Sequence, residues 1–168
     1  MCGIFGKLYF GRNEIEAKML VDCLNTLSHR GPDDSGIYED KHVFLGSKRL
    51  SIIDLSKAGH MPMCNEKQNL WIIFNGEIFN YREIRKKLEK KHRFISNTDT
   101  EVVLHLFEEM GPLCLNELRG MFAFAIWNAE KKELFLARDH IGKKPLKYYM
   151  DSNSFTFASE LKAILKDP

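Results

Sequence analysis

The sequence predicts an α+β fold whose antiparallel sheets are covered on both faces. Strand patterns begin the chain and dominate its end, and helical patterns lie between them. The run MFAFAIW at 121–127 is apolar at both alternating sets of positions, whereas an antiparallel strand with one exposed face would show one polar set. The 168 residues, 44% of them hydrophobic, suffice for one domain with its own core.

The N-terminal part combines a helix with two short strands. Apolar residues recur at helical spacing over 13–29, and a polar loop ends this helix. Strands are predicted at 43–45 and 50–53 because these segments are dense in branched and aromatic residues, with Gly46 between them. Arg49 is carried within this pair of strands.

The run LWIIF at 70–74 is too short for a helix and predicts a buried strand that leads into Asn75-Gly76. A polar pair at the end of a buried strand is a usual place for function. After Tyr81, Ile84 and Leu88 lie four residues apart among basic side chains, which predicts a surface helix.

A further helix is predicted to begin at 98–101 (TDTE), which has the pattern of a capping box. In this pattern, the Thr98 hydroxyl and the Glu101 carboxylate satisfy backbone N–H groups that the first turn leaves free. Gly111-Pro112 ends the helix. Asp99 therefore lies in the first turn of a buried helix.

Strands dominate the C-terminal part. The strand at 121–127 turns back through 133–137 as a hairpin, and short strands follow at 146–150 and 155–158. A short helical segment at 160–165 ends the pattern.

Composition and charge argue against several kinds of partner. The 25 Lys and Arg residues against 23 Asp and Glu give a net charge of +2, so we expect neither nucleic acid nor a membrane surface as a partner. The basic run at 82–93 contains interspersed glutamates, which indicates a solvated helix face. The chain starts without a signal-peptide pattern, so the cytoplasm is the expected location.

The four cysteines, Cys2, Cys23, Cys64 and Cys114, are far apart and form no CxxC pair. Neither a zinc site nor a redox pair is therefore expected from them, and no metal is assigned to this chain. Cys23 and Cys114 lie among apolar residues and are interpreted as small buried hydrophobes.

Cys2 stands out because it directly follows Met1. Removal of Met1 would leave a thiol and a free α-amino group on the same residue. A thiol pKa of about 8.5 and an α-amine pKa of about 8 are close, so proton transfer between these groups is easy at neutral pH. An N-terminal cysteine is thus a nucleophile with its own base. The alternative is that a cysteine stands at position 2 by chance.

Polar groups near the ends of strands and at the start of a helix complement this nucleophile. Attack on a carboxamide forms an oxyanion, which the Asn75 side chain and the Gly76 backbone can stabilise as donors. Arg49 offers a planar fork for a carboxylate, and Asp99 offers an anion for an ammonium group. A ligand with all of these groups is glutamine or asparagine.

Each of these residues also has a plainer interpretation. Arg49 can form a salt bridge at a strand edge, and Asp99 can complement the dipole at a helix N-terminus. Asn75-Gly76 can be a hairpin turn, because Asn-Gly is a strong turn signal.

Several ordered motifs over nearly the whole chain resemble the class II glutamine amidotransferases, which are N-terminal-nucleophile hydrolases. The likeness is greatest to the glutaminase domain of glutamine-hydrolysing asparagine synthetases. The motifs are MCGIFG at 1–6, RGPD at 30–33, RLSIIDL at 49–55, NGEI at 75–78, TDTE at 98–101, RGMFAF at 119–124, RD at 138–139 and KPL at 144–146. Lys147 departs from the aromatic residue that this family often has after the last motif.

The resemblance implies a four-layer αββα sandwich and a set of site residues. Cys2 would be the nucleophile, and Asn75 with Gly76 would form the oxyanion hole. The contacts to bound glutamine would come from Arg49 at the α-carboxylate, Glu77 and Asp99 around the α-amino group, and the backbones of Leu50 and Ile53. The loop with Arg30 and Gly31 would shape the site.

The resemblance also implies that residues 1–168 are a single glutaminase domain, either the N-terminal part of a longer synthetase or a separate subunit. Its ammonia would serve a partner synthetase domain, with asparagine synthesis from aspartate as the expected use. The sequence lacks the SGGxDS-type loop of such synthetases. ATP and Mg²⁺ are therefore expected only in that other domain, and no cofactor is expected in this one.

Other functions stay open. The domain can be a catalytically silent interaction or regulatory module, in which an uncleaved Met1 would acylate the Cys2 amine and remove the base. It can also supply ammonia to a different acceptor. The oligomeric state is open as well, with a homodimer among the options.

Overall fold

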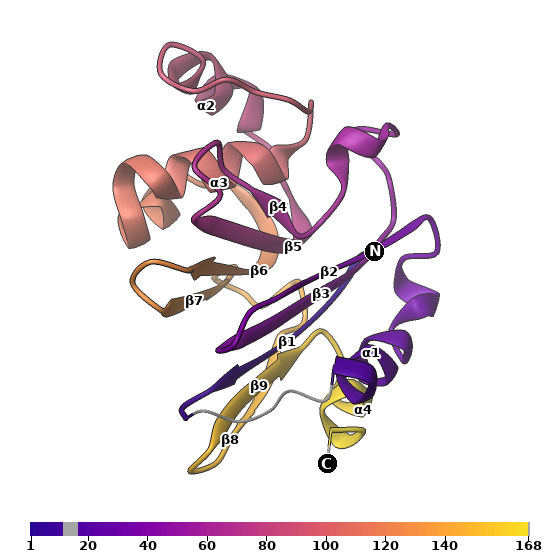
Figure 1. The fold of residues 1–168 in the computed structure, drawn as a ribbon. Helices are drawn as coiled ribbons and strands as arrows, with labels where there is room; N and C mark the ends of the chain where they lie inside the picture. Colours follow the sequence, from indigo (N-terminus) through magenta and orange to yellow (C-terminus); the bar gives the residue numbers. More distant parts are fainter. Residues whose placement is uncertain (12–16, 168) are drawn as a thin grey trace.

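The computed structural model, described for residues 1–11 and 17–167, contains two antiparallel sheets that face each other (Figure 1). The five-stranded sheet has the order β2-β3-β1-β9-β8, and the four-stranded sheet has the order β4-β5-β6-β7. The first sheet comprises β1 (Gly3–Tyr9), β2 (Asp34–Glu39), β3 (Val43–Arg49), β8 (Lys147–Met150) and β9 (Ser154–Ala158). The second comprises β4 (Met63–Cys64), β5 (Leu70–Ile78), β6 (Gly120–Asn128) and β7 (Glu133–Arg138).

Helices cover the outer face of each sheet (Figure 1). The five-stranded sheet contacts α1 (Ala17–Asn25) and α4 (Leu161–Leu165). The four-stranded sheet contacts α3 (Asp99–Met110), on which α2 (Tyr81–Leu88) packs. Short 3-10 helices lie at Ser28–Arg30, Lys57–Gly59 and Gly111–Asn116.

A hydrophobic core fills each boundary between layers. The core between the two sheets contains Ile4, Val43, Leu45, Ile73, Ala123, Ala125, Trp127 and Phe157. On the side of α1 and α4, the core contains Phe5, Phe44 and Ala158 together with residues of those helices. On the side of α2 and α3, it contains Phe74, Phe122, Phe124 and Ile126. This arrangement confirms the four-layer αββα sandwich.

The strand β6 confirms the prediction that both of its faces are buried. It lies between β5 and β7 in the four-stranded sheet. Its even-numbered side chains from Phe122 to Ile126 face the helices, and its odd-numbered ones from Ala123 to Trp127 face the other sheet. The apolar character of both faces therefore follows from its position in the middle of the sandwich.

The predicted strand at 50–53 is wrong. β3 continues through Gly46, and the chain leaves the sheet after Arg49. The ladder stops there because Gly3, the first residue of β1, lies opposite Lys48, and β2 begins opposite Arg49. Neither neighbouring strand offers a partner beyond this point, so 50–53 becomes a loop at the end of the sheet.

The predicted helix over 13–29 is confirmed in part. The structure shows α1 from Ala17, and residues 13–16 lie outside the described part of the chain. After Asn25 the N–H groups of Thr26 and Leu27 bond to carbonyls three residues back rather than four. This tighter pattern ends the α-helix and leads into a 3-10 turn.

The helices α2 and α3 lie where predicted, and the predicted cap of α3 is half formed. The Thr98 hydroxyl accepts the Glu101 N–H, as a capping box requires. The Glu101 carboxylate instead accepts from Ile95 and Ser96, because the Thr98 N–H donates to Ser96 Oγ.

The predicted hairpin appears as β6 and β7, and β8, β9 and α4 follow it as predicted. In the parts of the chain that the structure describes, no helix has both the length and the apolar character needed to cross a bilayer.

Candidate active site

A cavity of about 410 Å³ lies where the chain before β1, the end of β3 and the end of β5 meet the start of α3. Its lining includes Cys2, Arg49, Leu50, Ile53, Asn75, Gly76, Glu77 and Asp99. Segments that are far apart in the sequence thus bring most of the predicted site residues around one space. Arg30 and Gly31 do not line this cavity, and they support its walls instead.

Cys2 lies in the cavity wall because it directly precedes β1. The Cys2 sulfur is 3.4 Å from the Leu50 amide nitrogen, from which it accepts, and 3.7 Å from the Leu50 carbonyl oxygen, to which it donates. Burial raises the pKa of the Cys2 thiol, and the contact with Leu50 offsets this rise only in part. The thiol therefore stays protonated at neutral pH until a base removes its proton.

Arg30 and Gly31 fix the backbone next to Cys2. Arg30 Nε donates to the Cys2 carbonyl at 2.9 Å, and Arg30 Nη1 pairs with Glu160 at 2.8 Å. Gly31 lies directly against β3, since a Cβ atom there would be 2.2 Å from the Lys48 carbonyl oxygen. These two residues hold the start of β1 and the end of β3 in place.

Asn75 and Gly76 lie inside β5, so the interpretation as a hairpin turn is wrong. Side chains alternate along a strand, and Asn75 therefore shares the face of Ile73, which packs between the two sheets. Asn75 is 1% exposed, and its Nδ2 group has no hydrogen-bond partner among the described residues. This buried donor in the cavity wall is available to an acceptor in the cavity.

The backbone of Gly76 offers a second donor. The Ile78 N–H donates to Asp99 Oδ2 at 2.9 Å, on the side of β5 away from β6. Alternate N–H groups of a strand point the same way, so the Gly76 N–H also points away from β6. The pairing of β4 with β5 ends at Ile72, and this edge of Gly76 is therefore not covered by β4. A Cβ on Gly76 would lie 2.5 Å from the Met121 carbonyl oxygen, which excludes a larger residue.

Arg49 is a buried cation, 6% exposed, at the end of β3. Its guanidinium donates to the carbonyl of Ser56 at 3.1 Å and to the carbonyl of Asp54. Among the described residues no carboxylate forms an ion pair with Arg49, so the predicted alternative of a strand-edge salt bridge is not formed. A buried cation without an anionic side chain favours an anionic ligand.

The position of Asp99 is compatible with both of its predicted interpretations. It lies in the first turn of α3, where a carboxylate complements the helix dipole, and it also lines the cavity. Burial raises the pKa of Asp99 to about 6, although the N–H bond from Ile78 opposes the rise. The Glu77 side chain, exposed at the cavity rim, adds negative charge beside it.

A comparison with protein families gives a match along the full chain. Residues 1–168 match a family described as "glutamine amidotransferase domain". The chain belongs to this family. Asparagine synthetase [glutamine-hydrolyzing] 3 of Bacillus subtilis is 43% identical to this amidotransferase domain over 172 residues, which cover 100% of the chain and 28% of the relative. Asparagine synthetase B of Escherichia coli is 38% identical over 167 residues, which cover 98% of the chain and 30% of the relative.

The amidotransferase domain also resembles solved structures. Glutamine phosphoribosylpyrophosphate amidotransferase from B. subtilis, complexed with ADP and GMP, superposes with a TM-score of 0.80 at 22% identity, covering 97% of this chain and 43% of that one. An allosteric regulatory enzyme of purine biosynthesis gives a TM-score of 0.81 at 24% identity, covering 98% of this chain and 43% of that one. These neighbours show the fold of the N-terminal-nucleophile amidotransferases.

The amidotransferase domain is short in comparison with its relatives. It spans 28%, 35% and 27% of the length of three asparagine synthetases, two from B. subtilis and one, a putative one, from Methanocaldococcus jannaschii. The remaining length of those proteins has no counterpart in the 168 residues of this chain.

Sequence reasoning missed the loop before β8 as part of the site of the amidotransferase domain. Lys143 and Lys144 line the cavity, and Lys144 is 6% exposed with its Nζ 3.1 Å from the Met1 sulfur. Asp139 holds this loop because its carboxylate accepts the backbone N–H groups of both lysines. The KPL motif at 144–146 marks this loop in the sequence, but nothing in the local sequence indicates that the loop lies next to Cys2.

The residues with metal-binding geometry are separate from this cavity. Among the described residues, the group arranged to hold a metal ion consists of Glu66, His92, His105 and Glu108. None of them lines the cavity that contains Cys2.

Proposed function

We propose that this domain hydrolyses the side-chain amide of L-glutamine to glutamate and ammonia, with Cys2 as the nucleophile. The observation that carries the proposal is the meeting, around one cavity, of the half-buried Cys2 thiol, the unpartnered amide donor of Asn75 and the buried cation of Arg49. These groups complement the carboxamide and the α-carboxylate of glutamine. The names of the asparagine synthetases, which are described as glutamine-hydrolysing, support the same substrate.

Removal of Met1 prepares the nucleophile. The freed α-amine of Cys2 accepts the thiol proton, which the raised pKa of the thiol otherwise retains. The thiolate attacks the side-chain amide carbon of glutamine, and the oxyanion accepts from Asn75 Nδ2 and the Gly76 N–H. The α-ammonium then protonates the amide nitrogen, the carbon–nitrogen bond breaks, and ammonia leaves. Water attacks the resulting γ-glutamyl thioester, which releases glutamate and restores Cys2.

Other residues orient the substrate. Arg49 binds the α-carboxylate, and Asp99 with Glu77 binds the α-ammonium group. Backbone groups of Leu50 and Ile53 complete the contacts from the loop at the end of β3. The N–H bond from Ile78 to Asp99 supports this part because it holds the carboxylate at the cavity wall.

We also propose that the ammonia is used by an ATP-dependent synthetase domain or subunit, for asparagine synthesis from aspartate, and that ATP and Mg²⁺ bind there. The names and the greater lengths of the relatives support this organisation. A different acceptor is the alternative, since an amidase of Gibberella zeae is 37% identical over 89% of the chain. A cytoplasmic location is supported by the free thiols of all four cysteines.

A catalytically silent module is the competing function, and it requires that Met1 is retained. Met1 lines the cavity, and its sulfur lies 3.1 Å from Lys144 Nζ. A retained Met1 would acylate the Cys2 amine, so the thiol would lose its base.

Glutamate release from glutamine, measured together with the intact mass, tests the proposal. The purified protein is expected to lack Met1, to turn over glutamine and to form a covalent adduct with diazo-oxo-norleucine. Cys2→Ala should abolish turnover and adduct, whereas Cys64→Ala, outside the cavity, should keep both. Equal rates in wild type and Cys2→Ala would contradict the mechanism. Retained Met1 without turnover would favour the silent module.

A further inference from the structure

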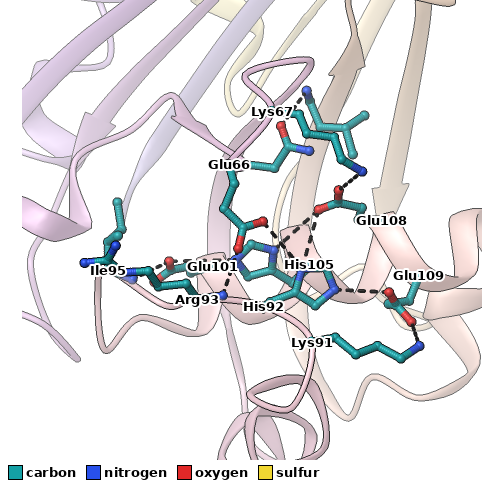
Figure 2. A network of polar contacts seen from close by, with 12 residues as sticks. Glu66, Lys67, Lys91, His92, Arg93, Ile95, Glu101, His105, Glu108 and Glu109 are labelled. Atoms are coloured by element: carbon teal, nitrogen blue, oxygen red, sulfur yellow. Dashed lines mark hydrogen bonds and ion pairs between the residues drawn. The ribbon is translucent and has the colours of Figure 1, made fainter.

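A cluster of two histidines and two glutamates lies on the four-stranded sheet and its helices (Figure 2). None of the four residues lines the cavity of the proposed active site. Glu66 comes from the turn between β4 and β5, and His92 follows α2. His105 and Glu108 lie on α3, three residues apart on one face of the helix. Three separate segments of the chain therefore contribute to this cluster.

The four side chains direct one atom each toward a common point. His92 Nδ1 is 3.6 Å from Glu66 Oε2 and 3.7 Å from Glu108 Oε2, and His105 Nδ1 is 3.6 Å from the same Glu108 oxygen. All four atoms lie within 4.8 Å of one another. These separations exceed hydrogen-bond distances, whereas ligands of a tetrahedral zinc ion with bonds of about 2.0 Å lie about 3.3 Å apart.

One oxygen of each carboxylate in the cluster already has a partner outside the cluster. Glu66 Oε1 accepts the Arg93 N–H at 2.8 Å, and Glu108 Oε1 pairs with Lys67 Nζ at 3.3 Å. These contacts leave the Oε2 atom of each glutamate directed into the cluster (Figure 2).

The second nitrogen of each histidine faces a carboxylate outside the cluster. His92 Nε2 is 3.2 Å from Glu109 Oε1, and His105 Nε2 is 3.8 Å from Glu101 Oε1. A carboxylate bonded to a ligating histidine fixes the ring and the tautomer at metal sites, and Glu109 is placed to do this for His92. The His105 contact with Glu101 is longer than a hydrogen bond.

Burial distinguishes this cluster from a group of solvated charges. His105 is 2% exposed, and His105 Nδ1 and Glu108 Oε2 are both buried without a hydrogen-bond partner among the described residues. A buried polar atom without a partner is costly, so a buried pair of such atoms that face each other calls for a group between them.

We propose that Glu66, His92, His105 and Glu108 bind one divalent transition-metal ion, with Zn²⁺ as the best match. Two imidazoles and two carboxylates form a donor set suited to zinc, and four protein ligands leave no open position for catalysis. The ion is structural and joins the β4–β5 turn, the segment after α2 and α3. Glu101 connects it to the proposed active site, because the same carboxylate accepts from Ile95 and Ser96, just before the cap of α3.

The experiment measures metal bound to the whole chain. Protein stripped with a chelator is titrated with Zn²⁺ against a competing dye, and bound Co²⁺ is followed by its visible absorption. Wild type is expected to bind one ion per chain and to show the intense bands of tetrahedral cobalt. His92→Ala and Glu66→Gln should each weaken Zn²⁺ binding by about tenfold or more. His140→Ala, at an exposed histidine outside the cluster, should bind like wild type.

Circular dichroism of each stripped variant separates loss of the site from loss of the fold. Glu66 is the most exposed of the four ligands, with a side chain 44% exposed, so Glu66→Gln is the variant expected to fold without metal. A folded wild type that binds Zn²⁺ no more tightly than folded Glu66→Gln would overturn the proposal. So would a cobalt spectrum without tetrahedral bands. In either case the cluster would be a proton-sharing network of histidines and glutamates.

Discussion

Asn75 has a role in the structure that its local sequence does not reveal. Asn-Gly favours a turn, yet both residues continue β5 because Ala123 and Phe122 of β6 pair with them. The candidate nucleophile, Arg49 and Asp99 were accessible from residue chemistry and family resemblance. The free Nδ2 group and the direction of the Gly76 N–H depend on strand pairing, which local sequence does not specify.

Asn75→Ala should lower kcat for glutamine hydrolysis by about 10² to 10³ and leave KM nearly unchanged, because the donor acts on the oxyanion. Asn97→Ala is the matched control, since Asn97 is exposed beside the site and uses its backbone N–H to bind Asp54. Steady-state kinetics of both variants test this. A rise in KM with kcat unchanged would assign Asn75 to substrate binding instead.

Asp99→Asn should raise the free energy of unfolding at pH 8 by about 2 to 3 kcal/mol and remove glutamine turnover. Burial raises the folded-state pKa of Asp99 to about 6, above its unfolded value of 3.8. The folded protein therefore holds this proton more tightly, and stability falls as pH rises from about 4 to about 6. Urea unfolding of both proteins should show that Asp99→Asn gains less free energy of unfolding over wild type at pH 5 than at pH 8.

Asp139→Asn provides the control with the opposite sign. Burial opposes ionisation of Asp139, but backbone N–H groups, including those of Lys143 and Lys144, hold its pKa below the usual range. Such a depressed pKa contributes stability above the unfolded pKa and loses it as pH falls. Asp139→Asn should therefore be less stable than wild type at pH 8. A gain in both variants would contradict the assigned directions.

At the scale of elements, the regular patterns were predictable and their ends were not. The apolar alternation of β6 and the stripe of α2 indicated the right structures because both reflect burial within one element. The end of β3 at Arg49 was missed because it depends on where β1 and β2 begin. That end creates the loop at 50–53, which forms one wall of the cavity.

Gly31→Ala should lower the free energy of unfolding by about 1 to 3 kcal/mol, because overpacking of a tight contact displaces its neighbours. Gly31 lies in the loop whose Arg30 holds the Cys2 backbone, and its new Cβ would lie 2.2 Å from the Lys48 carbonyl oxygen of β3. Gly11→Ala is the matched control, since a Cβ there meets no atom of the described residues within 4 Å, its chain neighbours aside. Urea unfolding of both variants checks the prediction, and equal effects would contradict the role of the contact.

At the scale of the whole molecule, the chain closes on itself between its first strand and its last helix. Lys7 of β1 pairs with Asp167 after α4, with Nζ 2.7 Å from Oδ1 and 2.6 Å from Oδ2, and Thr156 donates to the same carboxylate. The sequence predicted both elements but not this pair, which joins residues at opposite ends of the chain. Layer order was likewise supplied by the resemblance, because hydrophobic periodicity does not say which sheet a strand joins.

Asp167→Ala should cost about 3 to 5 kcal/mol of stability, because Lys7, 8% exposed, would be left buried and unpaired. The double variant Lys7→Met with Asp167→Leu should recover most of this loss, since apolar replacement of a buried pair is often neutral. Glu89→Ala, which breaks the exposed pair with Arg85, should cost less than about 1 kcal/mol. Similar losses in Asp167→Ala and Glu89→Ala would contradict the burial argument.

The short length of β4 has a consequence for how β5 is completed. A strand edge with free N–H groups attracts another extended chain, and β4 satisfies this edge only as far as Ile72. Asp99 then takes the Ile78 N–H, and the Gly76 N–H lies between these two capped positions. In the proposed reaction, the carbonyl oxygen of the substrate amide accepts from the Gly76 N–H, where a neighbouring strand would otherwise place a carbonyl. The substrate is thus bound by a backbone donor that the sheet leaves without a partner strand.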